Sequence, residues 1–336
     1  MHVVDAHSHL YPRSYLELLK TRTEVPRVGQ DAGAERFVIF PAEQATPGGG
    51  RKIDESFWDV EAKLDYMDAV GIDQTVVSLG NPWLDPFDGP DSADWARRLN
   101  AELASLEPET DGRLVALGVL PTDEVDHAVE VAREVAATPT LHGLIGSCRI
   151  CGLEFDDERL LPLWEELERS ELPLFVHPHD GVAVEDLTGY GNSLPLALGF
   201  PFETTIAVTR LVFSGVLARC PKLRIMVAHG GGTLPFLAAR LDVTWRSDPD
   251  AQAKLDASPS SQLSSLYLDA VLYHPRALRA AAELVGPQRM LFGTDHPFFS
   301  ADPRTSRDAV DAEFRDGART DVLSGTALSL FGLNHG

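Results

Sequence analysis

The first residues of this chain that could do chemistry are two histidines, His7 and His9, in the run Val3-Val4-Asp5-Ala6-His7-Ser8-His9. Residues two apart in a β-strand point to the same side, so both imidazoles would project from one face of a short apolar strand. Neutral imidazole nitrogens are good ligands for transition metals. The pair therefore predicts half of a metal site, which other parts of the chain would have to complete.

Three further side chains, His177, His229 and Asp295, each come at or just after the end of an apolar, β-rich run. A single histidine at a strand end is most often a capping or partly buried polar residue, so each one alone carries little weight. A polar residue that follows an apolar run on four separate strands is harder to assign to chance. Together with His7 and His9, these residues favour one shared metal site.

The elements that must position these residues alternate along the chain. Apolar β-rich runs are separated by helical segments, which is typical of parallel strands with crossover connections. Eight such units predict a closed α/β barrel of the (β/α)8 TIM type, in which all strand C-termini converge on one mouth. The expected strands are Val3–His7, Gln74–Leu79, Leu114–Leu120, Leu141–Gly146, Leu172–His177, Leu223–His229, Leu266–Ala270 and Met290–Gly293. The expected helices are Ala62–Val70, Ala93–Leu106, Val125–Ala136, Asp157–Arg169, Thr204–Ala218, Leu234–Trp245, Pro275–Leu284, Ser306–Phe314 and Thr320–Phe331.

The connection after the first strand is far longer than an ordinary βα loop. It contains a strand-like run, Arg36–Phe40, and a glycine-rich stretch, Gly48–Gly50. An insertion at this point lies at the C-terminal face of a barrel, where active sites lie. We therefore expect one domain over residues 1–336, with residues 11–52 as a small cap insertion.

Composition limits the partners. The 336 residues carry 29 basic and 51 acidic side chains, a formal charge of −22, which disfavours nucleic acid and anionic membrane surfaces. No uninterrupted apolar run reaches the roughly 18 residues that a membrane helix needs. The N-terminus enters a strand with no basic region or cleavage signal, so we expect a cytoplasmic protein. The acidic balance still permits a small anionic substrate, because a site can carry a local charge opposite to the whole.

These residues resemble the amidohydrolase superfamily, with its Asp-x-His-x-His opening, its strand-end histidines and its aspartate after the eighth strand. The chain is most similar to the branch of aminocarboxymuconate-semialdehyde decarboxylase-like proteins, through Pro221–Arg240, Ser214–Arg219, and Arg51 with Trp58 and Tyr66-Met67-Asp68. Within that branch it resembles the iso-orotate (5-carboxyuracil) decarboxylases. The segments that carry this likeness are Asp5–Pro12, Ser78–Trp83, Leu194–Thr205 and Phe292–Phe299. Salicylate-type decarboxylases share much of the pattern.

The resemblance implies a metal site and a proton-transfer set. The expected ligands are His7, His9, His177 and Asp295, with His229 beside the metal as a base or orienting group. Two-metal barrels of this type usually carry a bridging lysine or glutamate on the fourth strand, and Leu141–Gly146 has neither, which favours one divalent metal. Mixed nitrogen and oxygen ligands suit Zn²⁺, and Mn²⁺ is not excluded. No organic cofactor is expected. Catalytic proton transfer would fall to His229 and Asp295.

The resemblance also implies substrate contacts. Arg51 resembles the arginine that binds the substrate carboxylate, Asn81 and Phe200 resemble pocket residues, and Arg240 resembles an arginine that can reach a neighbouring subunit, which implies a homodimer. Without the resemblance, these residues would be ordinary: a loop arginine, a turn residue before Pro82, a core phenylalanine and an arginine on a helix surface.

The sequence therefore predicts a metal-dependent nonoxidative decarboxylase that releases CO2 from a planar aromatic or heterocyclic carboxylate. The alternative is a metal-dependent hydrolase of an amide, lactone or ester on the same scaffold, since the same ligands could activate water. A metal-binding protein without catalysis is disfavoured, because three histidines and one aspartate leave coordination positions open.

Overall fold

The computed structural model describes the whole chain except residues 32, 45–47, 88, 299–303 and 335–336. Its centre is an eight-stranded parallel sheet in simple sequential order. The sheet closes on itself, because the Ala6 amide donates to the Phe292 carbonyl at 2.8 Å and Ser8 pairs with His296. The strands are β1 (Val4–His9), β5 (Gln74–Ser78), β6 (Leu114–Val119), β7 (Leu141–Gly146), β8 (Leu174–Val176), β9 (Ile225–Val227), β10 (Tyr267–Asp269) and β11 (Met290–Leu291).

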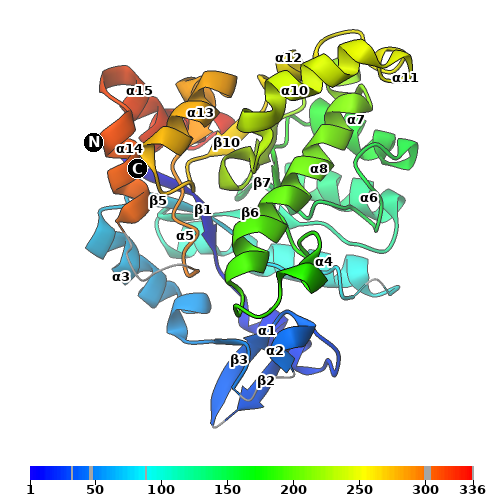
Figure 1. The fold of residues 1–336 in the computed structure, drawn as a ribbon. Helices are drawn as coiled ribbons and strands as arrows, with labels where there is room; N and C mark the ends of the chain where they lie inside the picture. The colour runs from blue at the N-terminus through cyan, green and yellow to red at the C-terminus, as the bar shows by residue number, and fades with distance from the viewer. Residues whose placement is uncertain (32, 45–47, 88, 299–303, 335–336) are drawn as a thin grey trace.

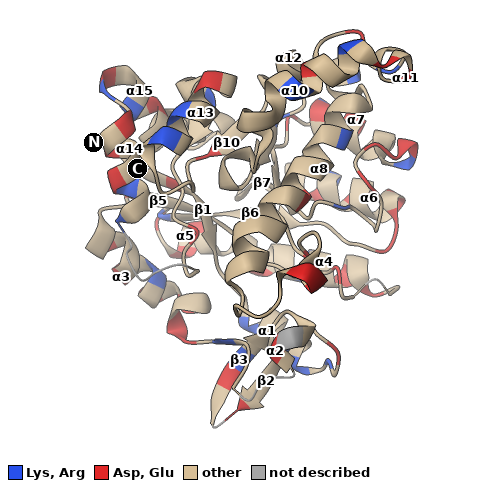
Figure 2. Cartoon of the chain, viewed as in Figure 1, with Lys and Arg blue, Asp and Glu red and all other residues tan. Residues whose placement is uncertain are grey.

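Helices surround this barrel, and the charged side chains lie mostly on them and on the outer loops (Figures 1 and 2). Strands such as β1, β5 and β6 are buried along their whole length, as expected for a parallel sheet covered by helices. The α-helices outside the cap are α3 (Val60–Val70), α4 (Ser92–Ala104), α5 (Leu106–Glu109), α6 (Val125–Ala136), α7 (Leu161–Arg169), α8 (Phe200–Phe213), α9 (Val216–Arg219), α10 (Leu234–Ser247), α11 (Pro249–Gln252), α12 (Pro259–Leu263), α13 (Pro275–Val285), α14 (Thr305–Glu313), α15 (Asp316–Thr320) and α16 (Thr326–Phe331).

Short turns of other helix types complete the fold. The 3₁₀ turns are η1 (Glu55–Phe57), η2 (Glu158–Leu160), η3 (Val184–Leu187), η5 (His229–Gly231) and η6 (Pro287–Arg289). Two π-helical turns, η4 (Pro195–Gly199) and η7 (Asp321–Gly325), lead directly into α8 and α16.

The connection after β1 forms a small body beside the barrel, at the lower edge of Figure 1. Its elements are α1 (Arg13–Lys20), β2 (Arg27–Asp31), β3 (Ala34–Val38), α2 (Pro41–Gln44) and β4 (Arg51–Lys52). The strands β2, β3 and β4 form an antiparallel sheet in that order. We call the described residues between Arg27 and Lys52 the cap. Pairing of Phe37 with Arg51 fixes the position of Arg51 on this sheet.

The predicted barrel is confirmed, and the differences lie at the element ends. The first strand runs to His9 instead of ending at His7, whereas the strands expected over Leu172–His177 and Leu223–His229 are only three residues long. The helix expected at Thr204 begins at Pro195 as a π turn, because prolines at 195 and 201 fall in first turns, where a missing N–H costs nothing. It ends at Phe213, before the left-handed Gly215. Helix α1 was not predicted.

One helical segment, Pro195–Phe213, has the length and mean hydropathy of a membrane span, although the sequence offers no uninterrupted apolar run of that length. A little under half of its most apolar window is buried inside the fold. The segment also carries Glu203, whose carboxylate accepts hydrogen bonds from the His179 and Gly181 amides at 3.0 and 2.7 Å. This carboxylate ties the helix to the segment after β8.

Candidate functional site

The structure brings together His7, His9, His177 and Asp295, the four residues predicted as metal ligands. One side-chain donor atom from each lies within 4.8 Å of the other three, and all four residues are buried. His7 and His9 come from β1, His177 follows β8, and Asp295 follows β11. Strand ends that are far apart in sequence therefore meet at one mouth of the barrel, as the sequence predicted.

The spacing of these donors fits a single ion. The Nε2 atoms of His7 and His9 are 3.2 Å apart, and they lie 3.4 and 3.3 Å from Asp295 Oδ1. Two donors bonded to one ion at about 2.1 Å, with an angle of about 90–110° between them, are roughly 3.0–3.4 Å apart. His177 Nε2 and Asp295 Oδ1 are buried and have no hydrogen-bond partner within the described structure. Buried polar atoms without partners are costly, so a cation explains them better than an empty space.

Each of the three histidines is oriented by its other nitrogen. His7 Nδ1 donates to Asp269 Oδ2 at 2.5 Å, and His177 Nδ1 donates to the Pro178 carbonyl at 2.8 Å. His9 Nδ1 lies 3.1 Å from the Ser78 hydroxyl. Partners of this kind fix the orientation of each ring and direct Nε2 toward the position of a metal. The four side chains are thus prepared to coordinate before an ion arrives.

Electrostatics also favour a cation at this point. Burial opposes a charge on His7, but the carboxylates of Asp295 and Asp269 outweigh it and raise the pKa of His7 to about 10. Burial works against ionised Asp295 as well, yet the charge of His7 and contacts with His229 and His9 hold the pKa of Asp295 well below its usual range. In the absence of a metal, a proton on His7 therefore supplies the positive charge that the two carboxylates favour at this position.

Asp269 was missed in the sequence, although it carries the same signal as the others, a polar residue at the end of an apolar strand. It is fully buried. Besides the His7 ring, it accepts hydrogen bonds from the backbone amides of His229 and Gly230 at 2.9 and 2.8 Å. One carboxylate therefore positions a predicted ligand and the loop that carries the predicted base.

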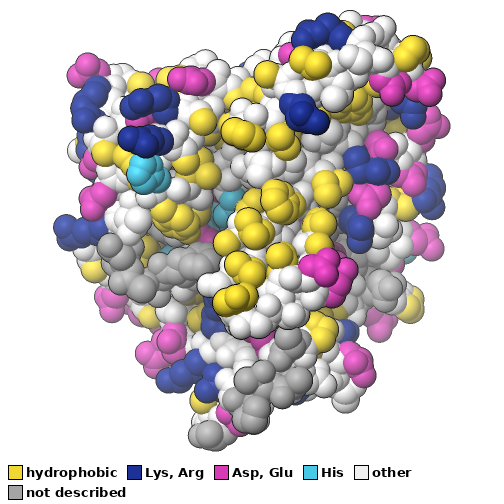
Figure 3. Space-filling view, viewed as in Figure 1, with side chains coloured by type: hydrophobic (Ala, Val, Ile, Leu, Met, Phe, Trp, Pro, Cys, Tyr) yellow, Lys and Arg dark blue, Asp and Glu magenta, His cyan; other side chains and the backbone are white. Residues whose placement is uncertain are grey.

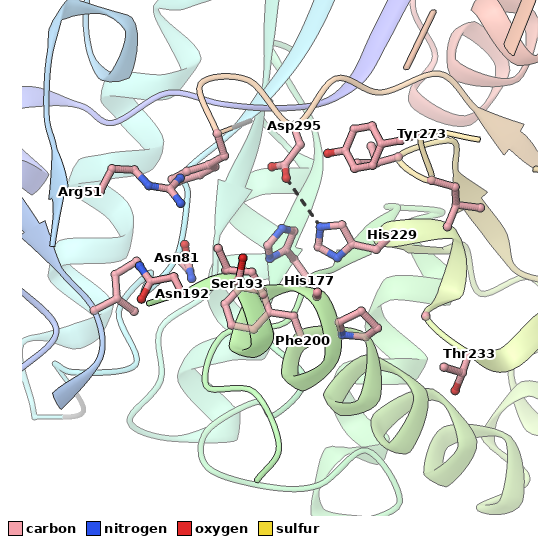
Figure 4. Close-up of a pocket in the computed structure, with 18 residues that line it drawn as sticks. Arg51, Asn81, His177, Asn192, Ser193, Phe200, His229, Thr233, Tyr273 and Asp295 are labelled. Atoms are coloured by element: carbon pink, nitrogen blue, oxygen red, sulfur yellow. Dashed lines mark ion pairs between the residues drawn. The ribbon is translucent and has the colours of Figure 1, made fainter. Parts of the chain in front are cut away.

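His229, the predicted base, lies beside Asp295, with 3.8 Å between His229 Nε2 and Asp295 Oδ2 (Figure 4). Both residues have left-handed backbone conformations, with φ of 54° and 60°. Such conformations are uncommon for residues other than glycine, and hydrogen bonds hold them here: the Asp295 amide donates to the His7 carbonyl at 2.8 Å, and the His229 amide to Asp269. Tyr273, which also lines the cavity, has the same kind of conformation, with φ of 56°.

Lys63 is a second residue that the sequence analysis missed. It lies on α3 and is fully buried, although lysine is rarely buried without partners. Its ammonium donates to Ser8 Oγ and to the His9 carbonyl, both at 2.9 Å, and lies 2.6 Å from His296 Nδ1. Lys63 thus ties β1 to the segment after β11. No sequence pattern marks it, because its partners are backbone and side-chain atoms of distant segments.

A cavity of about 620 Å³ opens above the cluster. Arg51, Asn81 and Phe200 line it, as predicted, together with His177, His229 and Asp295 (Figure 4). The Arg51 guanidinium lies 4.5 Å from the Phe298 ring. Burial lowers the pKa of Arg51, and the negative charge of Asp295 partly offsets this effect. Lining residues that the sequence did not single out include Asn192, Ser193, Thr233 and Tyr273.

Arg240 does not belong to this cavity. It lies on α10 and is exposed, and it is not among the residues that line the site of its own chain. Arg240 therefore lies outside the cavity of its own chain, and its expected reach into a neighbouring subunit's site stays a prediction. The physical reason is that α10 begins at the mouth of the barrel and runs outward, so a residue two turns into the helix has left the cavity.

Comparisons with known proteins agree with this geometry. The sequence pattern of the amidohydrolase family matches residues 4–333. The 2-amino-3-carboxymuconate-6-semialdehyde decarboxylase of Dictyostelium discoideum is 27% identical, over 98% of this chain and 92% of that protein. The crystal structure of the IDCase of Metarhizium anisopliae is 33% identical, covers 98% of this chain and 97% of its own, and has a TM-score of 0.93.

A third protein similar to this chain is the 5-carboxyvanillate decarboxylase of Novosphingobium aromaticivorans, solved with manganese and 4-hydroxy-3-methoxy-5-nitrobenzoic acid. It is 20% identical, with coverage of 99% of this chain and 96% of that chain, and its TM-score is 0.81. At this identity it shows that the fold is shared.

Proposed function

We propose that this chain, which belongs to the amidohydrolase family, is a metal-dependent nonoxidative decarboxylase that releases CO2 from a planar aromatic or heterocyclic carboxylate. One observation carries the proposal. A half-buried guanidinium, Arg51, shares a cavity with the cluster of three histidines and Asp295, and it has no ion-pair partner among the described residues. An arginine fork beside a metal cluster suits a carboxylate held in two-point contact.

We propose His7, His9, His177 and Asp295 as the ligands of one divalent ion. A bound ion would supply Lewis-acid and templating chemistry toward the substrate oxygens. Three imidazoles and one carboxylate favour zinc as this ion. Manganese, which the Novosphingobium aromaticivorans enzyme holds, is the competing assignment. Elemental analysis of the protein purified without added metal decides between zinc and manganese. If neither zinc nor manganese restored activity to the metal-free protein, both assignments would be wrong.

The remaining residues have distinct roles in this proposal. Arg51 binds the carboxylate, Asn81 provides a polar contact, and Phe200 and Phe298 provide aromatic walls for a flat ring. His229 and Asp295 hold and move the proton. Decarboxylation requires a proton to add to the ring carbon that carries the carboxylate. The carbon–carbon bond then breaks, its electron pair returns to the ring, and CO2 leaves. His229 Nε2 and Asp295 Oδ2 are 3.8 Å apart, beyond direct hydrogen-bond distance, so a proton would pass between them through one water.

We also propose that two copies of the chain pair. Apolar side chains gather on the face over α8 (Figure 3), where Leu198, Phe202 and Ile206 are exposed. On α10, Phe236 is 89% exposed and lies one turn before Arg240, with Val243 a further turn on. Exposed apolar patches of this kind mark protein contacts. In a twofold pair, Arg240 could reach the partner's site. Light scattering tests the pairing, and a monomer at micromolar concentration would contradict it.

The function is tested by incubating the metal-loaded chain with 5-carboxyuracil, salicylate, 2,6-dihydroxybenzoate and a panel of lactones. We expect CO2 release and an ultraviolet change with at least one acid, and no lactone opening. Lactone hydrolysis without CO2 from any acid would favour the hydrolase and overturn the proposal. The same assay on protein treated with a chelator should show no release until a divalent metal is restored.

A further inference from the structure

A hydrogen bond joins the cap to the wall of the catalytic cavity. Asn192, in the segment that leads into η4, donates from Nδ2 to Oε1 of Glu43 at 2.5 Å. Glu43 lies on α2 of the cap and is buried. The two residues are 149 positions apart in the sequence. This part-buried contact between a carboxylate and an amide ties the cap to the segment before η4.

The cap holds Glu43 in one orientation. Its second oxygen, Oε2, accepts hydrogen bonds from the backbone amides of Ile39 and Phe40 at 2.7 and 2.9 Å. An ionised carboxylate can only accept, so Oε1 can face only the NH2 end of the Asn192 amide. The two ends of an asparagine amide have nearly the same shape, and the hydrogen-bond partner decides which way it turns. Glu43 therefore fixes the orientation of Asn192.

The other end of the same amide is available to a ligand. Asn192 lines the catalytic cavity together with Arg51, Asn81 and Ser193. Its Oδ1 receives no hydrogen bond from any residue in the part of the chain that the structure describes. A carbonyl oxygen held in a cavity wall is an acceptor for an N–H or O–H group.

We infer that Asn192 is a specificity-determining residue and that Glu43 is the residue that positions it. The Asn192 carbonyl accepts a hydrogen bond from a donor on the substrate ring, so the preferred substrate is a planar carboxylate that carries a ring N–H or a hydroxyl. This inference deepens the proposed function and rests on it. Arg51 and Glu43 both belong to the cap. The cap therefore contributes to the recognition of two features of the ligand, its carboxylate and its hydrogen-bond donor.

The first test is a pair of single variants. Glu43→Gln places an NH2 group opposite the Asn192 NH2, because the one remaining carbonyl is needed by Ile39 and Phe40. Asn192→Asp places two carboxylates against each other. Each variant should lower kcat/KM for 5-carboxyuracil by about tenfold, the upper end of what one hydrogen bond between neutral groups contributes. The loss should lie in KM, with kcat within about threefold of the parent.

The second test is the double variant Glu43→Gln/Asn192→Asp. The NH2 group of the glutamine introduced by Glu43→Gln can donate to the new carboxylate, which still offers an acceptor to the ligand. We expect the double variant to be more active than either single variant, a coupling that two independent losses would not produce. Asp186→Asn, an exposed change in the neighbouring η3, is the matched control and should have no effect.

The third test concerns selectivity. The parent should prefer 5-carboxyuracil over its N-methylated analogues and salicylate over 2-methoxybenzoate, and Asn192→Ala should reduce that preference about tenfold. An unchanged preference, with no gain in the double variant, would overturn the inference. If the parent releases no CO2 from any acid, the proposed function fails instead. The dissociation constants of the same acids and of their methylated analogues, measured by calorimetry, then test Asn192 alone.

Discussion

The two sides of the cavity are built in different ways. The floor consists of His7, His9, His177 and Asp295, which are buried at strand ends. Hydrogen bonds to Asp269 and to the Pro178 carbonyl orient His7 and His177. The opposite wall comes from the cap and from the segment before α8, and it presents Arg51 and Asn192. The floor belongs to the barrel itself, whereas the wall belongs to an insertion and a connecting segment. This division suggests that the floor sets the chemistry and the wall sets the substrate.

The largest expected effect comes from removing a floor residue. His177→Ala deletes a proposed ligand whose Nε2 has no other partner within the described structure. Loss of a residue that only orients a ligand typically costs about 10–100-fold, so loss of the ligand itself should lower activity by at least ~1000-fold. Metal content, measured after dialysis, should fall with it. His127→Ala, which changes a half-exposed histidine on α6 outside the cavity, is the control. If His177→Ala kept its full metal content, His177 would not be a metal ligand.

A change in the wall should separate binding from metal content. Arg51→Ala should leave metal content unchanged and lower kcat/KM by about 100-fold, mostly through KM, because a buried carboxylate would lose its charged partner. Arg51→Lys should recover only part of the loss, since an ammonium cannot form the two-point contact. If Arg51→Ala lost the metal, the two sides of the cavity would not be independent.

Asp269 lies behind the floor and orients His7 through a hydrogen bond to its ring. In Asp269→Asn, one oxygen becomes an NH2 group, so the hydrogen bonds to the His7 ring and to the His229 and Gly230 amides cannot all be kept. Metal affinity, measured by competition with a chelator, should fall about 10–100-fold. Asp94→Asn, an exposed change on α4, is the control. Equal affinity in parent and variant would show that His7 needs no orienting carboxylate.

The fold and the floor were predictable from the sequence because both follow from short-range patterns. Alternating apolar runs predicted the eight strands, and a polar residue after each run marked His177, His229 and Asp295. Asp269 carried the same mark and was overlooked. The barrel rule then brought these strand ends together without any knowledge of the loops.

The wall was less predictable, because no periodicity describes it. Arg51 was identified through a family resemblance, and Glu43 and Asn192 were not identified at all. Their contact depends on how the cap packs against the segment before η4, which is a property of the whole fold. Lys63 was missed for the same reason: its three partners lie in β1 and after β11. The position of Arg240, exposed on α10 and outside the lining of its own chain's cavity, was not predictable, because the sequence does not show how far α10 runs from the mouth.

A pH measurement tests the electrostatics of the floor. Without metal, the pKa of His7 is raised to about 10, whereas burial lowers the pKa of His9 to about 4 and that of His177 well below its usual value. At pH 7.5, a binding ion must therefore displace one proton, from His7. Apparent metal affinity should rise about tenfold per pH unit until the pH approaches 10 and should weaken as the pH falls. Calorimetry in buffers of different ionisation enthalpy should count one proton released, and a count of zero would contradict the charge assigned to His7.

The smallest expected effect distinguishes the aromatic part of the wall from the floor. Phe200 is buried, lines the cavity and packs near Phe40 of the cap, with 6.3 Å between the ring centres. Phe200→Leu keeps an apolar side chain but removes the flat surface for a substrate ring, which should cost about 0.5–1 kcal/mol, or roughly three- to fivefold in KM. Metal affinity should not change. Phe213→Leu, at the far end of α8 and outside the cavity lining, should leave KM as it is. If Phe200→Leu lowered kcat or metal content while KM stayed unchanged, Phe200 would affect the metal-binding residues of the floor. The wall and the floor would then not have separate roles at this position.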